Sequence, residues 1–297
     1  MTVAPSRSNT LPQYSPILRA LKTGLRLARQ TNAERIASLS FPLPQLDPLA
    51  VLLALSAAGQ RQCYFESPSR GQAIAAWDAL IDESFSGRDR FQTARHSLET
   101  WQARVKSLPD RREGPYFFCS FSFFDTLTPT LAGFAPATLV LTRWQVVRHH
   151  HRCTLIANVR LSPQTRLAPL AREIAEQVGK LQAFAPGKRP LELMGWGESD
   201  LQPQLSDPVR LALQHRVRQT LGAIQAQQLQ KQVIAHALDV TRSDAFRREV
   251  ALPRLRSRYP DCYIFSFSGA HDRHFIGASP QRLLSIQIGR ASGGARV

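Results

Sequence analysis

Two apolar runs rich in β-branched residues, 138–147 and 153–161, constrain the fold of this chain more than any other feature. Only the five residues Arg148–Arg152 separate them. Two such runs joined by a short polar connection are typical of a β-hairpin. We therefore expect an antiparallel sheet around which the other elements pack.

The rest of the chain mixes helical and strand patterns. Apolar residues with helical spacing predict helices at 16–29, 47–58, 162–181, 207–227 and 244–259, the first with a basic outer face. Strands are predicted at 62–66, 115–125, 231–240, 262–268, 274–277 and 283–288, and residues 71–82 look like a strand turning into a helix. This mixture predicts the α+β class, in the form of a layered α/β sandwich.

A proline-rich stretch, 184–208, is expected to link two halves of the chain. The expected organisation is a variable N-terminal extension (1–40), an N-terminal α/β half (41–205) and the first part of a second domain (206–288). Residues 289–297 are small, Gly-rich and basic, and they follow a predicted strand abruptly. This change of pattern predicts an aberrant tail on a C-terminally truncated product, whose fold is incomplete.

The net charge of +16 raises the question of a polyanionic partner. Only five of the 38 basic residues are lysines, and the 33 arginines are spread along the whole chain. Such spreading favours a composition bias over a nucleic-acid surface, while a positive interior would suit a dianionic small substrate. No run of about 18 apolar residues occurs, and the N-terminus has no signal-peptide core. We expect a cytoplasmic monomer without a membrane partner.

Few side chains stand out as candidates for chemistry. The four cysteines lack the spacing of a zinc site or a disulfide framework, which favours buried reduced thiols. The aromatic run at 115–125 is more typical of a core strand than of a ligand site. Residues His149–His151 suit an exposed turn better than a metal site, because neighbouring side chains alternate in direction. The segment Gly277–Pro280 lacks the closing glycine of a nucleophile elbow.

Lys231 is the residue singled out on physical grounds, because it begins an apolar, β-branched run. Burial at the mouth of such a strand would favour the neutral amine, which can act as a base. The alternative is that Lys231 extends to the surface at the strand edge. The pattern alone favours this alternative.

Several motifs resemble those of chorismate-using enzymes, in the same order. Residues His274–Leu284 (HFIGASPQRLL) resemble the family's F-x-G-A-S-P-E-x-L motif, and 229–236 resemble its K-V-V-L-A-R strand. Tyr64–Glu66 with 71–75 resembles an early glycine-containing segment, and the aromatic run ending at Asp125 resembles another. The similarity extends from about residue 45 to 288, and it identifies the chain as a member of this family, in the isochorismate synthase branch.

The resemblance implies roles for particular residues. Lys231 would be the general base that activates water for attack on ring carbon 2 of chorismate, whereas aminating relatives use ammonia and have a different residue there. Gly277, Ala278 and Ser279 would bind substrate. Gln281 takes the position of the family's general-acid glutamate, and its amide has no usable acidic proton. The family's Mg²⁺ ligands are expected beyond the end of this chain, with no metal ligand inside it.

The first hypothesis is therefore an isochorismate synthase that serves menaquinone, phylloquinone or siderophore synthesis, with little or no activity in this chain alone. A non-catalytic remnant or binding protein is the alternative, which Gln281 and the tail favour and Lys231 does not. An aminating chorismate enzyme is a further alternative. A basic nucleic-acid binder would show steeply salt-dependent binding to any duplex.

Overall fold

The structure is a computed structural model that describes residues 13–57, 59–108, 114–125, 133–184, 207–235 and 246–282. The chain divides into two compact units. One consists of Met1–Pro190 with Ala251–Val297, and the other of Leu191–Val250. The first unit, called the sheet unit below, contains every strand of the described residues.

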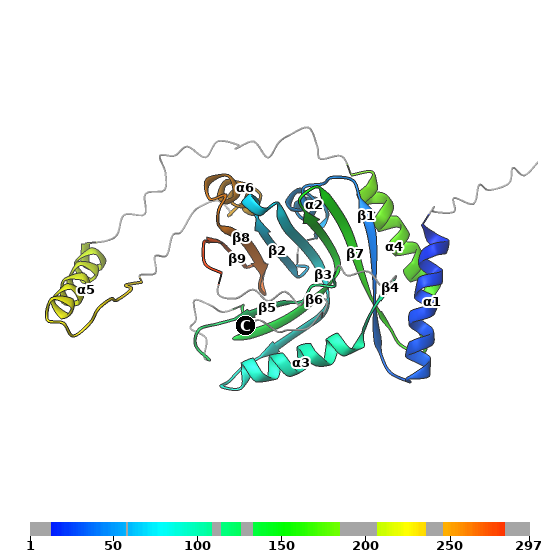
Figure 1. Ribbon diagram of the computed structural model, residues 1–297, viewed down its shortest axis with the longest axis horizontal. Helices are drawn as coiled ribbons and strands as arrows, with labels where there is room; N and C mark the ends of the chain where they lie inside the picture. The colour runs from blue at the N-terminus through cyan, green and yellow to red at the C-terminus, as the bar shows by residue number, and fades with distance from the viewer. Residues whose placement is uncertain are drawn as a thin grey trace, which may run out of the picture. The chain divides into compact units, whose positions relative to one another are not determined.

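The elements follow one another in a mixed order (Figure 1). The helices are α1 (Tyr14–Gln30), α2 (Pro48–Leu55), α3 (Arg90–Arg104), α4 (Leu167–Gln182), α5 (Asp207–Gln225) and α6 (Arg248–Arg258), with a 3₁₀ turn at Pro68–Arg70. The strands are β1 (Arg35–Leu43), β2 (Gln62–Ser67), β3 (Gln72–Phe85), β4 (Val105–Leu108), β5 (Phe118–Phe121), β6 (Ala137–His149), β7 (Arg152–Leu161), β8 (Tyr263–Ser268) and β9 (His274–Ser279). The predicted mixed α/β class is confirmed.

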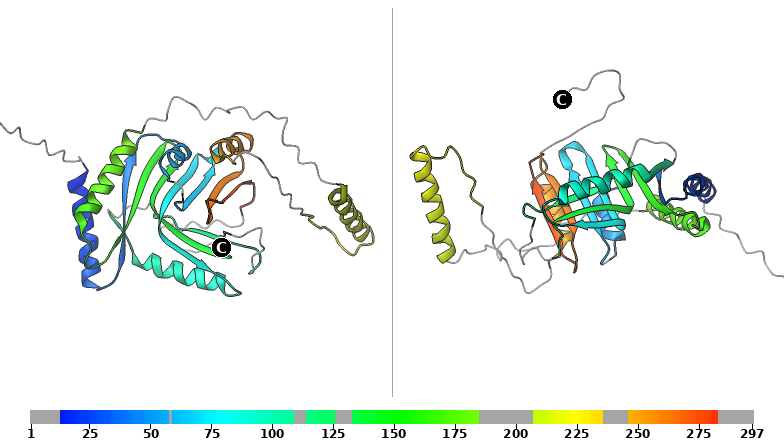
Figure 2. Two further views of the ribbon diagram at one scale, coloured as in Figure 1. Left: turned by 180° about the vertical axis from the view of Figure 1, so that it is seen from behind. Right: turned by 90° about the horizontal axis from the view of Figure 1, so that it is seen from below.

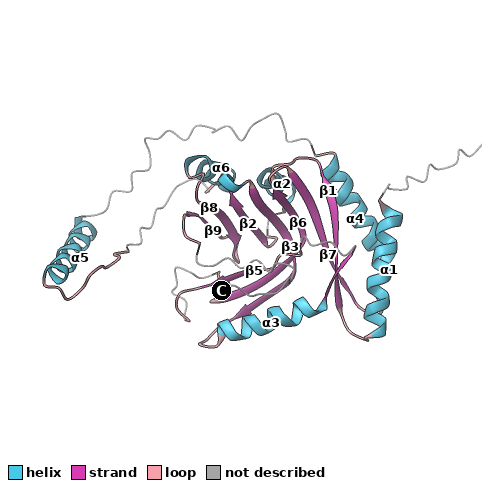
Figure 3. Ribbon diagram, in the orientation of Figure 1, coloured by secondary structure: helices cyan, strands magenta, loops and turns pink. Residues whose placement is uncertain are grey.

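All nine strands of the described residues form one sheet, in the order β4-β1-β7-β6-β3-β2-β8-β9, with β5 pairing to β6 (Figure 3). Every pairing is antiparallel except that of β1 with β4. The predicted hairpin is β6–β7, and its turn is at His150 and His151. Strand β8 pairs with β2, although about 200 residues separate them in sequence.

The helices cover the sheet unevenly, as the views in Figures 1 and 2 show. Helices α1, α2, α4 and α6 contribute side chains to the main core on one face, together with the inward residues of β1, β2, β6 and β7. Helix α3 packs on the other face, where Trp101 contacts a second apolar cluster around Ile36, Ile81 and Leu141. None of the helices in the described residues is long and apolar enough to cross a membrane.

Residues 71–82 form no helix, contrary to the sequence prediction. The alanines of this segment favour a helix locally. In the structure, however, the segment belongs to β3, a continuous strand that pairs with β2 on one side and with β6 on the other. These two ladders outweigh the weak local preference. The register shifts between Ala79 and Ile81, and Asp78 adopts a positive φ of 63°. This bulge bends the long strand.

Three further elements differ from the sequence prediction. Strands β1 and β4 and helix α3 were not predicted. The aromatic run at 115–125 forms a strand only over Phe118–Phe121, and Phe123 and Phe124 are exposed. Core packing therefore holds for the first part of that run alone. The predicted link at 184–208 and the predicted strand at 283–288 lie almost wholly or wholly outside the described residues.

Candidate functional site

The family-like motif at 274–281 lies on β9, an edge strand of the sheet. Gly277 faces Phe265 of β8, and a Cβ added at Gly277 would lie 2.4 Å from the Phe265 ring. A side chain there would overlap the ring, so packing requires glycine at this position. Ala278 lies opposite Ile264 and packs on the main core. Gly277 and Ser279 therefore share one face of the strand, and Ala278 points to the other.

Gln281 follows the strand and is exposed. Its backbone N–H donates to Oγ of Ser279, at 3.3 Å. This bond connects the end of β9 to the residues that follow it. The side-chain amide of Gln281 can donate and accept hydrogen bonds, but it has no acidic proton to release.

Lys231 belongs to the unit Leu191–Val250, whereas Gln281 belongs to the sheet unit. The predicted strand at 231–240 is wrong for residues 231–235, which are irregular, and 236–240 lie outside the described residues. Lys231 is exposed. The segment after it contacts α5, where Oγ1 of Thr220 donates to Oε1 of Gln232 over 3.0 Å. Strand pattern alone is insufficient here, because no neighbouring strand in the described residues pairs with this segment.

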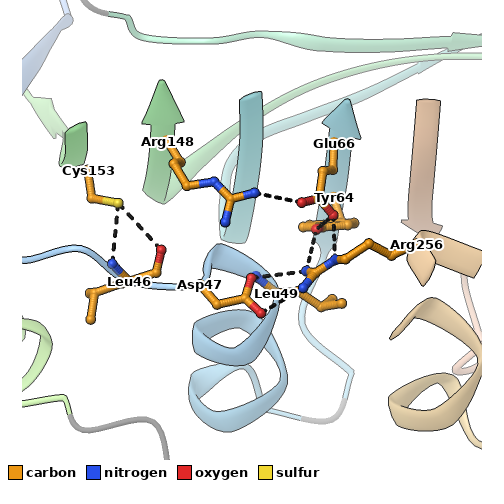
Figure 4. A network of polar contacts seen from close by, with 8 residues as sticks. All are labelled: Leu46, Asp47, Leu49, Tyr64, Glu66, Arg148, Cys153 and Arg256. Atoms are coloured by element: carbon orange, nitrogen blue, oxygen red, sulfur yellow. Dashed lines mark hydrogen bonds and ion pairs between the residues drawn. The ribbon is translucent and has the colours of Figure 1, made fainter. Parts of the chain in front are cut away.

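A buried carboxylate, Glu66 of β2, lies on the helix-covered face of the sheet (Figure 4). Its side chain is 1% exposed. One oxygen accepts from Arg148 of β6 at 2.7 Å, and the other accepts from Arg256 of α6 at 2.7 Å and from the Tyr64 hydroxyl at 2.5 Å. A buried carboxylate without such partners would be strongly destabilising.

Arg256 connects this carboxylate to helix α2. Its two terminal nitrogens donate to the two oxygens of Asp47, at 2.8 and 3.0 Å, and one of them also donates to the Tyr64 hydroxyl at 2.9 Å. Asp47 is the N-cap of α2 and accepts from the backbone N–H of Leu49. One guanidinium thus binds two carboxylates from different elements with a geometry that only arginine provides.

Burial and charge shift the pKa values inside this network. Burial raises the pKa of Tyr64 well above its ordinary value of 10.0, and the positive charge of Arg256 opposes this rise only in part. Burial alone would lower the pKa of Arg256, but hydrogen bonds to Asp47 and attraction to the neighbouring acids raise it above its ordinary value. Arg256 therefore stays charged and Tyr64 stays neutral.

The network holds α6 on the sheet, and α6 leads directly into β8 and β9. It therefore helps to position the strand that carries Gly277 and Ser279. From the sequence, Tyr64 and Glu66 are expected only as part of a family-like segment, Asp47 only as the start of a helix and Arg148 only in the hairpin connection. Their joint network with Arg256 is not predicted. A carboxylate at an inward position of an apolar strand is the signal that indicates a buried basic partner.

The opposite face of β2, β8 and β9 carries aromatic rings. Phe65 stacks on Tyr263 with centroids 5.1 Å apart, and Phe265 contacts Phe275 at 5.4 Å. Phe275 is 55% exposed. The two faces of the same strands therefore differ sharply in chemistry, with a charge network on one and apolar rings on the other.

The histidine cluster and the four cysteines are the remaining candidates from the sequence. His150 and His151 lie in the exposed β6–β7 turn, as predicted. The prediction is wrong for His149, which ends β6 and is half-buried, with its Nε2 3.3 Å from the Tyr116 hydroxyl. All four cysteines are free. Cys63 and Cys153 are buried and Cys262 is half-buried, but the prediction of burial is wrong for Cys119, which is exposed on β5. A short edge-side strand leaves one face of its residues in solvent.

Comparisons with known proteins identify the family that the motifs resemble. The family model described as "Chorismate binding enzyme" matches residues 20–294. No curated protein sequence matches the chain. Among solved structures, it is similar to MenF, the menaquinone-specific isochorismate synthase from Escherichia coli, with 17% identity and a TM-score of 0.46. The match covers 89% of this chain and 56% of the MenF chain. Because the family match spans nearly the whole sequence, the chain belongs to the chorismate-binding enzyme family.

Proposed function

We propose that this chain binds chorismate and takes part in its isomerisation to isochorismate. The observation that carries the proposal is the family match over residues 20–294. Lys231 supports the isomerising branch rather than the aminating one, because water needs a base before it becomes an effective nucleophile. Isochorismate is a precursor for quinone synthesis, and menaquinone synthesis is one pathway to test.

In the proposed reaction, Lys231 takes a proton from water while the water oxygen forms a bond to ring carbon 2. The ring double bonds shift, and the bond from ring carbon 4 to its hydroxyl oxygen breaks. The departing oxygen needs a proton, and Gln281 occupies the position from which that proton would come. Because an amide cannot supply it, we expect slow turnover.

The reaction is proposed to use Mg²⁺, which would neutralise a substrate carboxylate. Within the described residues, no three His, Cys, Asp or Glu side chains are placed to hold a metal ion. The described residues therefore do not fit the ion.

The test is a chorismate turnover assay on the purified 297-residue chain with Mg²⁺, with isochorismate separated by chromatography. The unaltered chain is expected to show little or no product. Gln281→Glu restores an acidic group and should raise turnover by about 100-fold or more. Adding Lys231→Ala to Gln281→Glu should remove that gain, because the base is then missing.

Gln281→Asn is the matched control, since it changes the side chain without adding an acid, and it should leave turnover unchanged. The proposal is wrong if Gln281→Glu yields no more product than Gln281→Asn. Product that forms only with ammonium, and carries an amino group, would indicate the aminating branch instead.

A second candidate function is chorismate binding without turnover. Gln281 favours it, because the position lacks an acidic proton. In that case Gln281→Glu would remain inactive while chorismate still binds.

A further inference from the structure

Helix α1 presents a row of four basic side chains that the proposed function does not use. Arg19, Lys22, Arg26 and Arg29 are spaced by three or four residues, so they lie on one side of the helix. All four are exposed. The helix rises 1.5 Å per residue, so the row is about 15 Å long. We call these four residues the α1 basic row.

The opposite side of α1 packs against the core. Ile17, Leu21 and Leu25 are buried there. At Gly24, an added Cβ would lie 2.8 Å from the Leu161 side chain, so the helix packs closely on the sheet. The orientation of the basic row is therefore fixed by packing, and the apolar side of α1 is not free to insert into anything else.

The described residues provide no acid that compensates the basic row. Helix α1 contains no Asp or Glu, and the first acidic residue of the whole sequence is Glu34. Among the described residues, none forms an ion pair or side-chain hydrogen bond with Arg19, Lys22 or Arg26 heads. Arg29 donates only to the backbone oxygen of Pro163. Like charges at this spacing destabilise a helix, so the row carries an energetic penalty in the isolated chain.

The neighbouring helix does not neutralise the row. Helix α4 packs beside α1 (Figures 1 and 2), and its exposed charges are balanced, with Arg172 and Lys180 against Glu173 and Glu176. Glu173 is already paired with Arg143, at 2.6 Å. Within the part of the chain that the structure describes, the positive charge of the α1 basic row is therefore left uncompensated.

In place of the sequence-based expectation of no membrane partner, we propose that α1 lies against an anionic lipid bilayer and binds it through the basic row. A straight, exposed row of cations suits a flat surface of phosphate groups, and each basic residue near such a surface adds to the attraction. Two helices packed side by side form a surface about 20 Å wide, which is too broad for the roughly 12 Å major groove of DNA. The attachment is peripheral and needs no membrane-spanning helix.

The test uses the full 297-residue chain and vesicle co-sedimentation. The vesicles consist of phosphatidylcholine alone or with about 30% phosphatidylglycerol, which makes the surface negative. We expect binding to the anionic vesicles only. It should weaken strongly between 0.1 M and 1 M salt, where the screening length falls from about 10 Å to about 3 Å.

Replacing all four residues of the α1 basic row with Gln should weaken vesicle binding by at least about 30-fold. A matched variant removes four exposed charges elsewhere in the sheet unit, Arg88, Arg95, Arg152 and Arg258. It should change binding by less than about threefold, because those residues lie outside the contact. Replacing Arg19, Arg26 and Arg29 with Lys should retain binding. Circular dichroism checks that each variant is folded.

Three results would overturn the proposal. Equal losses in the two fourfold variants would mean that net charge, and not α1, drives binding. Equal binding to neutral vesicles would exclude an electrostatic contact. Tight, salt-dependent binding to duplex DNA or poly(U) without binding to anionic vesicles would assign the basic row to nucleic acid.

Discussion

Apolar side chains are in opposite situations in the two compact units. In the sheet unit, Tyr64, Leu139 and Leu155 are completely buried. In the described part of Leu191–Val250, Leu221 is 52% exposed and Val233 is 81% exposed. A strand or helix pattern gives stability only when its apolar face is covered, so the free energy of unfolding resides mainly in the sheet unit. Mutations in the two units should differ accordingly.

Arg256→Ala should have the largest effect on stability. It would leave Glu66 and Asp47 with one basic partner fewer, at a position where Glu66 is buried. Removing one partner of a buried ion pair destabilises a protein by about 3–5 kcal/mol. Urea unfolding followed by circular dichroism measures the change. Arg258→Ala, an exposed position on the same helix, should change stability by less than about 0.5 kcal/mol; equal effects would contradict the importance of the network.

Leu155→Ala should destabilise the chain by about 2–5 kcal/mol, because Leu155 is 0% exposed in the main core. Leu221→Ala on α5 is the matched substitution in the other unit and should change stability by no more than about 0.5 kcal/mol. The same urea titrations compare the two. A large loss for Leu221→Ala would mean that α5 is covered by a partner surface, and the contrast between the units would fail.

Gly277→Ala should cost about 1–3 kcal/mol, because the new Cβ would overlap the Phe265 ring. Combining it with Phe265→Leu should recover part of this loss, since the smaller side chain leaves room. A melting curve for each variant and for the double variant measures the coupling. Strictly additive effects would indicate that the glycine has another role, such as contact with substrate.

Alkaline pH should weaken the sheet unit through Cys63. Burial raises the pKa of this thiol from 9.0 to about 12. The folded chain therefore keeps a proton that the unfolded chain loses, so stability is complete below pH 9 and falls as the pH rises towards 12. The slope is at most about 1.4 kcal/mol per pH unit. Between pH 9 and 10, Cys63→Ala should show a shallower decline than the unaltered chain; an unchanged slope would exclude the thiol as its cause.

Sequence reasoning succeeds where the pattern is local. The hairpin β6–β7 and the amphipathic helices α1 and α4 depend on period and short turns, and both features are present in the sequence. It fails at β3, where the alanines favour a helix and only pairing with β2 and β6 decides for a strand. It also fails at 231–235, whose strand pattern has no pairing partner among the described residues.

Some site residues are recognisable from the sequence, whereas others are found only through contacts in the structure. The motif around Gly277 was found by resemblance, but the packing reason for its glycine depends on Phe265 of the neighbouring strand. Asp47, Glu66 and Arg256 come together across as many as 209 residues of sequence. No local sequence pattern predicts which of the 33 arginines will bind a given carboxylate. Contacts of this kind can be identified only from the structure.

The most direct test of the account is titration calorimetry of chorismate into the unaltered 297-residue chain, with benzoate as a control anion. Binding does not require the missing acid at Gln281, so it tests the family assignment separately from turnover. We predict saturable binding of chorismate with a dissociation constant between about 1 μM and 1 mM, and none of benzoate. Absence of saturable chorismate binding by the folded chain, or equal binding of both anions, would contradict a chorismate-binding function.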